Sequence, residues 1–289
     1  MAVIDIHNHL SAVVNLYEGG PHRGPTGLRT TPIVDEELRM LGRNWIEEQD
    51  RIGISHAFVF DWDWARVKKF CTWFDERFRG MVVVDPRQTG EAISAVESCF
   101  RSGLFVGVKL APVPSWSGDA RPYHFDDRKA FDFYDYCQGS GVPIMFHTGA
   151  IYTRSSDSDQ PTGNLVRYCR PIDLDAVART FPDLQVIVGH AGRPLWQETL
   201  CLANLPNVWI DLTWSQLPIA LYEETFRHCL PGFGAHRIMF GSDSSPWSPD
   251  KFVELHSETV RVMEKYGSNE SDIEAVLFGN AKRLFLDDR

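Results

Sequence analysis

Eight short apolar runs recur along the chain, each bounded by residues that favour turns. Several runs are apolar at nearly every position, which is typical of strands that are buried on both faces of a parallel sheet. Segments with a helical spacing of apolar residues separate them. The runs are VIDIHNHL (3–10), HAFVFDW (56–62), MVVVDP (81–86), LFVGVKLAP (104–112), VPIMFHTG (142–149), LQVIVGHA (184–191), VWIDLTW (208–214) and RIMFGSDS (237–244).

Helix ends are marked in several of the intervening segments. Residues 128–141 finish in a glycine at a C-cap position, and residues 173–183 finish at Pro182. Ser271 and Glu274 have the spacing of a capping box, which predicts the start of a last helix that runs to about residue 285.

Eight strand–helix units in 289 residues predict a single α/β domain over residues 1–289, a closed (β/α)8 TIM barrel. An open doubly wound sheet is the alternative, but it usually has a glycine-rich phosphate loop after its first strand, which VIDIHNHL lacks. The longest predicted loops are 11–33, 112–127 and 149–171, after strands 1, 4 and 5. In a barrel these loops lie at the C-terminal face, where active sites are built.

Charge and composition exclude several classes of function. The net charge of −10 argues against a nucleic-acid partner, which would need a basic surface. No apolar run approaches the roughly 20 residues of a membrane helix, and no basic segment precedes the first run. The six cysteines form no CxxC pair, which favours reduced thiols. We therefore expect a cytoplasmic protein that binds neither nucleic acid nor membrane.

The first strand has two histidines one residue apart at the end of an apolar run. Strict alternation places Asp5, His7 and His9 on one face of the strand, and Ile4 and Ile6 on the other. Two imidazoles on one face are either ordinary packing or two ligands of one metal ion.

Polar residues stand at the same end of several other strands. Any one of them has a structural explanation, such as a hydrogen-bonded core histidine or an aspartate that caps the next helix. A barrel would bring them all into one ring, and neutral imidazoles with a carboxylate suit a divalent ion such as zinc that keeps an open position for water. The strand-end residues are His7, His9, Lys109, His147, His190 and Asp243.

In these segments the sequence resembles the amidohydrolase superfamily of metal-dependent hydrolases. It is most similar to the "amidohydrolase 2" branch, which includes aminocarboxymuconate semialdehyde decarboxylase. The matching segments cover the chain in order: DIHNH (5–9), GVKLAP (107–112), PIMFHTG (143–149), FPDLQVIVGHAG (181–192), NVWIDLT (207–213), RIMFGSDSSPW (237–247) and GNAKRLF (279–285).

The resemblance implies a distorted barrel with metal at its C-terminal mouth. It makes His7, His9 and His147 metal ligands, and it makes Asp243 both a ligand and the acceptor of a proton from the bound water. His190 matches a histidine that polarises or protonates the substrate in single-metal members of the superfamily.

Lys109 is open to two interpretations under this resemblance. In two-metal members a lysine at this strand is carbamylated and bridges both ions, and the strand-6 histidine binds the second ion. The GVKL context is closer to the single-metal branch, where the lysine would contact a substrate anion or have a structural role. We therefore expect one divalent ion, zinc first and manganese second, with a two-metal site through carbamylated Lys109 as the alternative.

The predicted reaction is hydrolysis of a C–O or C–N bond in a lactone, amide or ester of a small anionic organic acid. A metal-activated water would attack, Asp243 would accept its proton, and His190 would act on the carbonyl or the leaving group. Metal-dependent decarboxylation is the main alternative, because the same strand-end residues serve it. An inactive metal-binding interaction protein is a further alternative.

The substrate is predicted to be a small molecule that carries a carboxylate. Lys109, Arg23 and Arg154 are candidate contacts for that anion, and Trp62 is a candidate wall of the pocket. Solvated loop charges and core packing are the alternative explanations for these residues. A homodimer is also left open.

Overall fold

The computed structural model describes six ranges of the chain, and everything below concerns these residues: 1–10, 34–112, 122–150, 165–213, 219–246 and 251–287.

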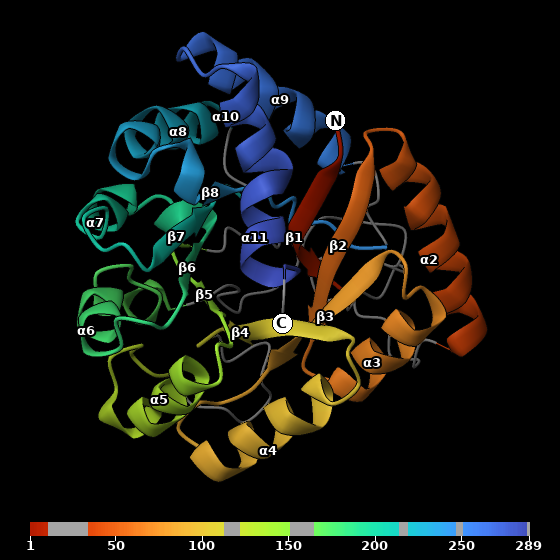
Figure 1. The fold of residues 1–289 in the computed structure, drawn as a ribbon, viewed down its shortest axis with the longest axis vertical. Helices are drawn as coiled ribbons and strands as arrows, with labels where there is room; N and C mark the ends of the chain where they lie inside the picture. The colour runs from red at the N-terminus through yellow and green to blue at the C-terminus, as the bar shows by residue number, and fades with distance from the viewer. Residues whose placement is uncertain (11–33, 113–121, 151–164, 214–218, 247–250, 288–289) are drawn as a thin grey trace, which may run out of the picture.

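The eight predicted strands form one parallel sheet in the order β1 to β8, rolled into a barrel with helices on the outside (Figure 1). This confirms the TIM-barrel prediction over the open doubly wound sheet, since every strand pairs with the next strand along the chain. The strands are β1 Val3–His9, β2 Ile54–Asp61, β3 Phe78–Val83, β4 Phe105–Leu110, β5 Ile144–His147, β6 Val186–Gly189, β7 Val208–Asp211 and β8 Ile238–Met239.

Helices follow the strands as a (β/α)8 chain requires. They are α2 Asp35–Asp50, α3 Trp64–Trp73, α4 Thr89–Phe100, α5 Phe131–Gly139, α6 Asp173–Thr180, α7 Trp196–Leu200, α8 Ile219–Phe233, α9 Lys251–Lys265, α10 Glu270–Glu274 and α11 Asn280–Phe285. Short 3-10 turns include η3 His190–Gly192, and the π-helical segment η5 Ala275–Gly279 joins α10 to α11. No helix among the described residues is long and apolar enough to cross a membrane.

The barrel closes between β1 and the segment that follows β8. Asp243 N donates to the His7 carbonyl at 2.9 Å, and His9 N donates to the Ser244 carbonyl at 2.9 Å. Asn8 and Ser244 form a parallel bridge. The first and last strands are thereby joined at the ends that carry His7, His9 and Asp243.

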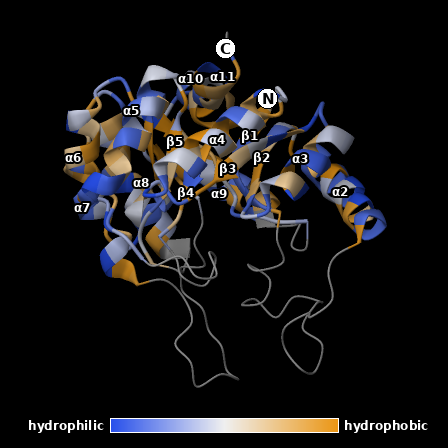
Figure 2. Ribbon diagram, turned by 90° about the horizontal axis from the view of Figure 1, so that it is seen from below, coloured by the Kyte–Doolittle hydropathy of each residue, from blue (hydrophilic) through white to orange (hydrophobic). Residues whose placement is uncertain are grey.

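Two hydrophobic layers hold the barrel. The larger layer fills the space between the sheet and the outer helices, and the smaller one fills the barrel interior. Ile4, Ile6 and Phe58 belong to the interior layer, together with Leu284 and Phe285 of α11. The rings of Phe58 and Phe285 lie 5.0 Å apart, so α11 covers the N-terminal end of the barrel. Figure 2 shows α10 and α11 on the same side as the N-terminus.

The predicted capping box of the last helix lies at a different position from the one expected. Asn269 is the N-cap of α10, its side chain accepts from Asp272 N at 3.0 Å, and Asp272 accepts in return from Asn269 N. The Ser271 and Glu274 spacing is therefore not the cap. Asparagine is as good an N-cap as serine, and aspartate replaces the glutamate of the usual motif.

Candidate active site

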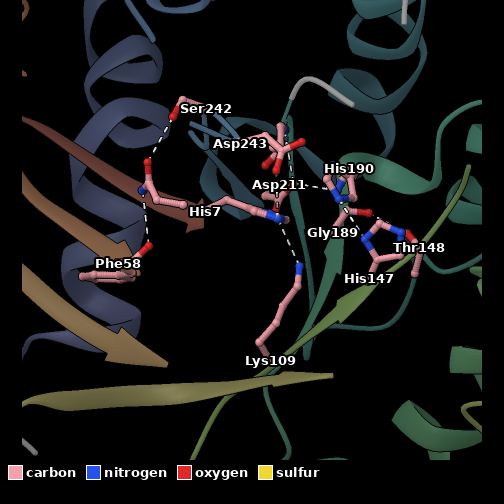
Figure 3. Close-up of polar contacts among 12 residues, drawn as sticks. His7, Phe58, Lys109, His147, Thr148, Gly189, His190, Asp211, Ser242 and Asp243 are labelled. Carbon is pink, nitrogen blue, oxygen red and sulfur yellow. Dashed lines mark hydrogen bonds and ion pairs between the residues drawn. The ribbon is translucent and has the colours of Figure 1, made fainter. Parts of the chain in front are cut away.

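Three of the four predicted metal ligands, His7, His9 and Asp243, come together at the C-terminal end of the barrel. Figure 3 shows His7 and Asp243 there, with Asp211 and His190 beside them. His9 Nε2 lies 3.0 Å from Asp243 Oδ1, and His7 Nε2 lies 3.8 Å from the same oxygen. One ligand atom from each of the three residues lies within 4.8 Å of those from the other two. Both histidines are buried, and Asp243 is partly exposed. This arrangement matches the donor set that the sequence indicated.

A β-bulge brings the two histidines to this position. The pairing register between β1 and β2 shifts between Asp5 and Asn8. Strict alternation therefore fails within β1. Ile4 and Ile6 lie in the barrel interior, and beyond the bulge the side chain of His7 also points toward the site. The prediction that Asp5 shares a face with the histidines is wrong, because one extra residue in a strand turns the following side chains to the other face.

Asp5 instead belongs to a buried polar network behind the two histidines. Its carboxylate accepts from Ser242 Oγ at 2.5 Å, from Ser242 N at 3.0 Å and from His7 N at 3.2 Å. Asn8 Oδ1 accepts from Ser244 Oγ at 2.8 Å. Burial raises the pKa of Asp5 to about 7. These bonds fix the backbone on both sides of His7, so the network positions the ligands.

Asp211, at the end of β7, holds His7 in one tautomer. His7 Nδ1 donates to Asp211 Oδ2 at 2.7 Å, so the Nε2 atom keeps its lone pair for a metal. The other carboxylate oxygen of Asp211 accepts from His190 N at 2.6 Å and from Thr213 N at 3.1 Å. The sequence interpretation gave Asp211 no role, although it ends its strand as the other candidate residues do.

His147 and His190 form a second pair beside the first group. Their Nδ1 and Nε2 atoms lie 3.0 Å apart, and His190 packs against the ring of His7 with centroids 4.6 Å apart. The Nδ1 atom of His190 is buried and has no hydrogen-bond partner among the described residues. His147 is not part of the group formed by His7, His9 and Asp243. It is connected to that group through His190, which contacts both His147 and His7.

The backbone is strained at two of these residues. His190 has φ 59° and Asp243 has φ 58°, the left-handed region that residues other than glycine seldom adopt. Such conformations cost roughly 1–3 kcal/mol each and cluster at functional sites. Backbone hydrogen bonds hold both residues in this conformation. His190 N donates to Asp211, and Asp243 N donates to the His7 carbonyl.

The buried histidines are held neutral. Burial lowers the pKa of His7, His147 and His190 well below the usual histidine range, and in His7 the nearby Lys109 ammonium lowers it further. A metal ion binds the neutral imidazole, so this environment suits a ligand set.

These pKa shifts predict that the metal-free protein loses stability in mild acid. The histidines take up protons below about pH 6.5 in the unfolded chain but not in the folded protein, so stability falls as the pH falls. Asp5 acts in the opposite direction, since its folded form binds a proton below about pH 7. Within this site three histidines outweigh one carboxyl, so we expect its contribution to stability to fall as the pH falls from 6.5 to 5. Urea unfolding of chelator-treated protein measures it, and a flat or rising profile would contradict the shifts.

Lys109 is buried against His7. Its Nζ atom donates to His7 Nε2 at 3.1 Å and lies 4.9 Å from the centre of the Phe60 ring. Burial lowers its pKa to about 8. The lysine shares the His7 lone pair that a metal would need, so metal binding has to displace this hydrogen bond. Its predicted contact with a substrate anion stays a prediction.

The other predicted substrate contacts are only partly described. Arg23 and Arg154 lie outside the described residues. Trp62 is half-buried at the end of β2 and packs against the barrel-interior layer. It lines a cavity of about 520 Å³ together with Val83 and Ala92. Its Nε1 atom is buried without a hydrogen-bond partner among the described residues.

The donor set fits a divalent metal ion. Two neutral imidazole nitrogens and a carboxylate oxygen converge, and the His7 tautomer directs a lone pair to the same place as His9 Nε2. Nitrogen and oxygen ligands of this kind suit zinc, manganese and similar ions. The fit therefore supports the predicted ligands His7, His9 and Asp243 on geometry that the structure shows.

Besides these three residues and the buried trio of His7, His190 and Asp211, a third group of possible ligands lies at the surface. His124 Nδ1 lies 2.9 Å from Asp173 Oδ2, and Asp126 is close to both. His124 and Asp126 are exposed, and exposed acidic groups of this kind are common without a metal.

Comparison with known proteins adds the family. The family model described as Amidohydrolase matches residues 4–286. No curated protein matches the sequence at a significant level.

Three solved structures illustrate the fold similarity. An amidohydrolase from Burkholderia multivorans with bound zinc has a TM-score of 0.67 and 17% identity, with 98% of this chain and 99% of that chain covered. A probable 2-pyrone-4,6-dicarboxylic acid hydrolase from Acinetobacter baumannii with citric acid bound has a TM-score of 0.64 and 16% identity, with 99% of each chain covered. A 2,6-dihydroxybenzoate decarboxylase complexed with 2,6-dihydroxybenzoate has a TM-score of 0.66 and 16% identity, with 99% of each covered.

Proposed function

The chain belongs to the amidohydrolase family of enzymes, and from this premise we propose that it hydrolyses a C–O or C–N bond in a lactone, amide or ester of a small anionic acid. One observation carries the proposal: the convergence of His7 Nε2, His9 Nε2 and Asp243 Oδ1 at the C-terminal end of the barrel. We propose that these atoms hold one divalent ion, zinc first and manganese second, with His147 as a further ligand.

A bound divalent ion would supply Lewis acidity and lower the pKa of a water from 15.7 to roughly 7. The chain's own residues do the rest. Asp243 is partly exposed, so its carboxylate can accept the proton of an attacking water at the mouth. Asp211 keeps His7 in the tautomer that a ligand requires.

The hydrogen bond between His147 and His190 fixes where His190 carries its proton. If His147 uses Nε2 as its ligand atom, its Nδ1–H donates to His190 Nε2 at 3.0 Å. A neutral His190 then carries its own proton on Nδ1, the buried atom without a partner among the described residues. That N–H is a donor for a substrate carbonyl or leaving group.

Decarboxylation is the second candidate, because the same atoms could hold a carboxylated substrate while a proton is delivered to carbon. Two fold neighbours are described as a hydrolase and a decarboxylase, so the fold similarity supports neither over the other.

Isotope labelling separates the two reactions. A panel of lactones, esters and amides of small carboxylic acids, with aromatic carboxylates beside them, is incubated with metal-replete enzyme in ¹⁸O-water or in D₂O. Hydrolysis places solvent ¹⁸O in the product, and this is the expected result. Stoichiometric CO₂ release with a solvent deuteron on carbon and no ¹⁸O would make the protein a lyase.

A further inference from the structure

Arg193 is a buried arginine beside His190. It follows η3, directly after the end of β6, and its exposed fraction is 1%. Its Nε atom donates to the His190 carbonyl at 3.3 Å, and its own carbonyl accepts from Ala150 N, just beyond β5. The residue therefore joins the ends of β5 and β6, the two strands that carry His147 and His190.

The guanidinium of Arg193 lacks partners for its terminal nitrogens. Neither Nη1 nor Nη2 has a hydrogen bond among the described residues, although both atoms are buried. Its centre lies 5.3 Å from the centre of the Tyr222 ring, which is a cation–π contact and satisfies no N–H donor. Buried polar groups are nearly always paired, and a buried charge without a partner is strongly unfavourable. An anion that the protein binds would supply the missing acceptors.

The surrounding charges also favour an anion. The Nε bond to the His190 carbonyl at 3.3 Å places the Arg193 guanidinium beside the candidate site, and the carboxylates of Asp211 and Asp243 act on it electrostatically. Those two acids are balanced by Arg193 and Lys109. A divalent ion on the predicted ligands would therefore leave this region positive.

Two further unpaired polar atoms belong to the residues bonded to Asp211. His190 and Thr213 both donate their backbone N–H to Asp211 Oδ1, at 2.6 and 3.1 Å. The Nδ1 atom of His190 and the Oγ1 atom of Thr213 are buried without hydrogen-bond partners among the described residues. Unpaired donors are thus concentrated between the ends of β6 and β7.

We propose that Arg193 binds a carboxylate of the substrate, with Nη1 and Nη2 donating to its two oxygens. Arginine presents two parallel N–H groups that match a carboxylate, which gives orientation as well as affinity. The proposal rests on the proposed function in one respect, that the substrate occupies the mouth formed by His7, His190 and Asp243. It adds the residue that selects anionic substrates over neutral ones.

The test measures binding rather than turnover, so it is independent of the reaction type. Acetate, benzoate, succinate and 2,6-dihydroxybenzoate are compared with their uncharged amides by thermal shift and calorimetry, at matched ionic strength and metal content. Wild-type protein should bind the carboxylates. Arg193→Met should weaken that binding about 10- to 100-fold, as expected for bonds to a charged group. Amide binding should be unchanged, and Arg193→Lys should retain part of the carboxylate affinity.

Arg237 provides the matched control, since both terminal nitrogens of its guanidinium are paired. It donates to the carbonyls of Leu205 and Ala203 at 2.7 and 2.6 Å. Arg237→Met should lower the melting temperature and leave the response to carboxylates intact. Without added anion, Arg193→Met should melt close to the wild-type temperature, because it removes two buried nitrogens that lack partners and gives up the Nε bond to the His190 carbonyl.

Three outcomes would overturn the proposal. They are an absence of carboxylate binding by the wild type, equal carboxylate binding by Arg193→Met, and a parallel loss of carboxylate and amide binding in that variant. A failure of the proposed function would look different. It would appear as missing metal or missing ¹⁸O incorporation, while Arg193-dependent carboxylate binding persisted.

Discussion

The His7→Ala/His9→Ala double variant should retain less than about a tenth of the divalent metal that the wild-type protein binds, and should lose activity by at least about 10⁴-fold. The wild type is expected to hold close to one equivalent. Loss of one residue that hydrogen-bonds to a metal ligand already lowers metal affinity 10–100-fold. This variant removes two of the proposed ligands themselves. Elemental analysis of both proteins after identical metal loading measures the effect.

The matched control is His124→Ala, which breaks the exposed group at His124 and Asp173 without touching the barrel mouth. Its metal content should equal that of the wild type. Equal metal in the double variant and the wild type would reject His7 and His9 as ligands, and loss of metal in the control alone would place the ion at the surface group. Two equivalents in the wild type would favour the two-metal alternative with carbamylated Lys109.

His190→Asn should keep most of the bound metal and lose activity by about 10²–10⁴-fold, the usual contribution of a general acid or base. The reason is the Nδ1 atom of His190, buried without a partner among the described residues and so available to a substrate oxygen. Asparagine retains a polar side chain but lacks the imidazole that bonds to His147 through Nε2 and presents Nδ1 at the same time. Steady-state kinetics across pH, with metal analysis on the same samples, measures both effects.

His228→Asn is the control for this variant, since His228 lies on α8 and stacks on Trp196 with ring centroids 4.1 Å apart. Its activity should match the wild type. Loss of one of two bound ions in His190→Asn would assign His190 to a second metal. Unchanged activity in His190→Asn would remove it from the mechanism.

The barrel could be predicted because its signals are local. Each strand is a short apolar run, and eight runs separated by helical segments leave few arrangements that bury them all. The same regularity placed His7, His147, His190 and Asp243 at one end of the barrel, and the structure has each of them there. Arg23 and Arg154 lie outside the described residues, so their predicted roles are still predictions.

The contacts that organise the site could not be predicted, because they join residues far apart in the sequence. Asp211 reaches His7 across 204 positions, and nothing near VWIDLT identifies that partner. The bulge in β1 depends on its pairing with β2 rather than on its own composition. In the sequence, Arg193 of HAGRP cannot be distinguished from a solvent-exposed loop arginine, because only the structure shows that it is buried. Alternation along a strand and position at a strand end predict where in the barrel a residue lies. They do not predict which distant residue its side chain contacts.

Closure of the barrel between β1 and the segment after β8 has a consequence for biosynthesis. Asn8 and Ser244 are bridged although 236 residues separate them, and Asp5 is bonded to Ser242 over a similar span. At 5–20 residues per second, the ribosome needs roughly 10–50 s to deliver the second partner after the first. Throughout that interval His7 and His9 are synthesised but lack Asp243, so a nascent chain cannot assemble the three-residue ligand group. The metal binding proposed for this group therefore requires the end of translation or a later time.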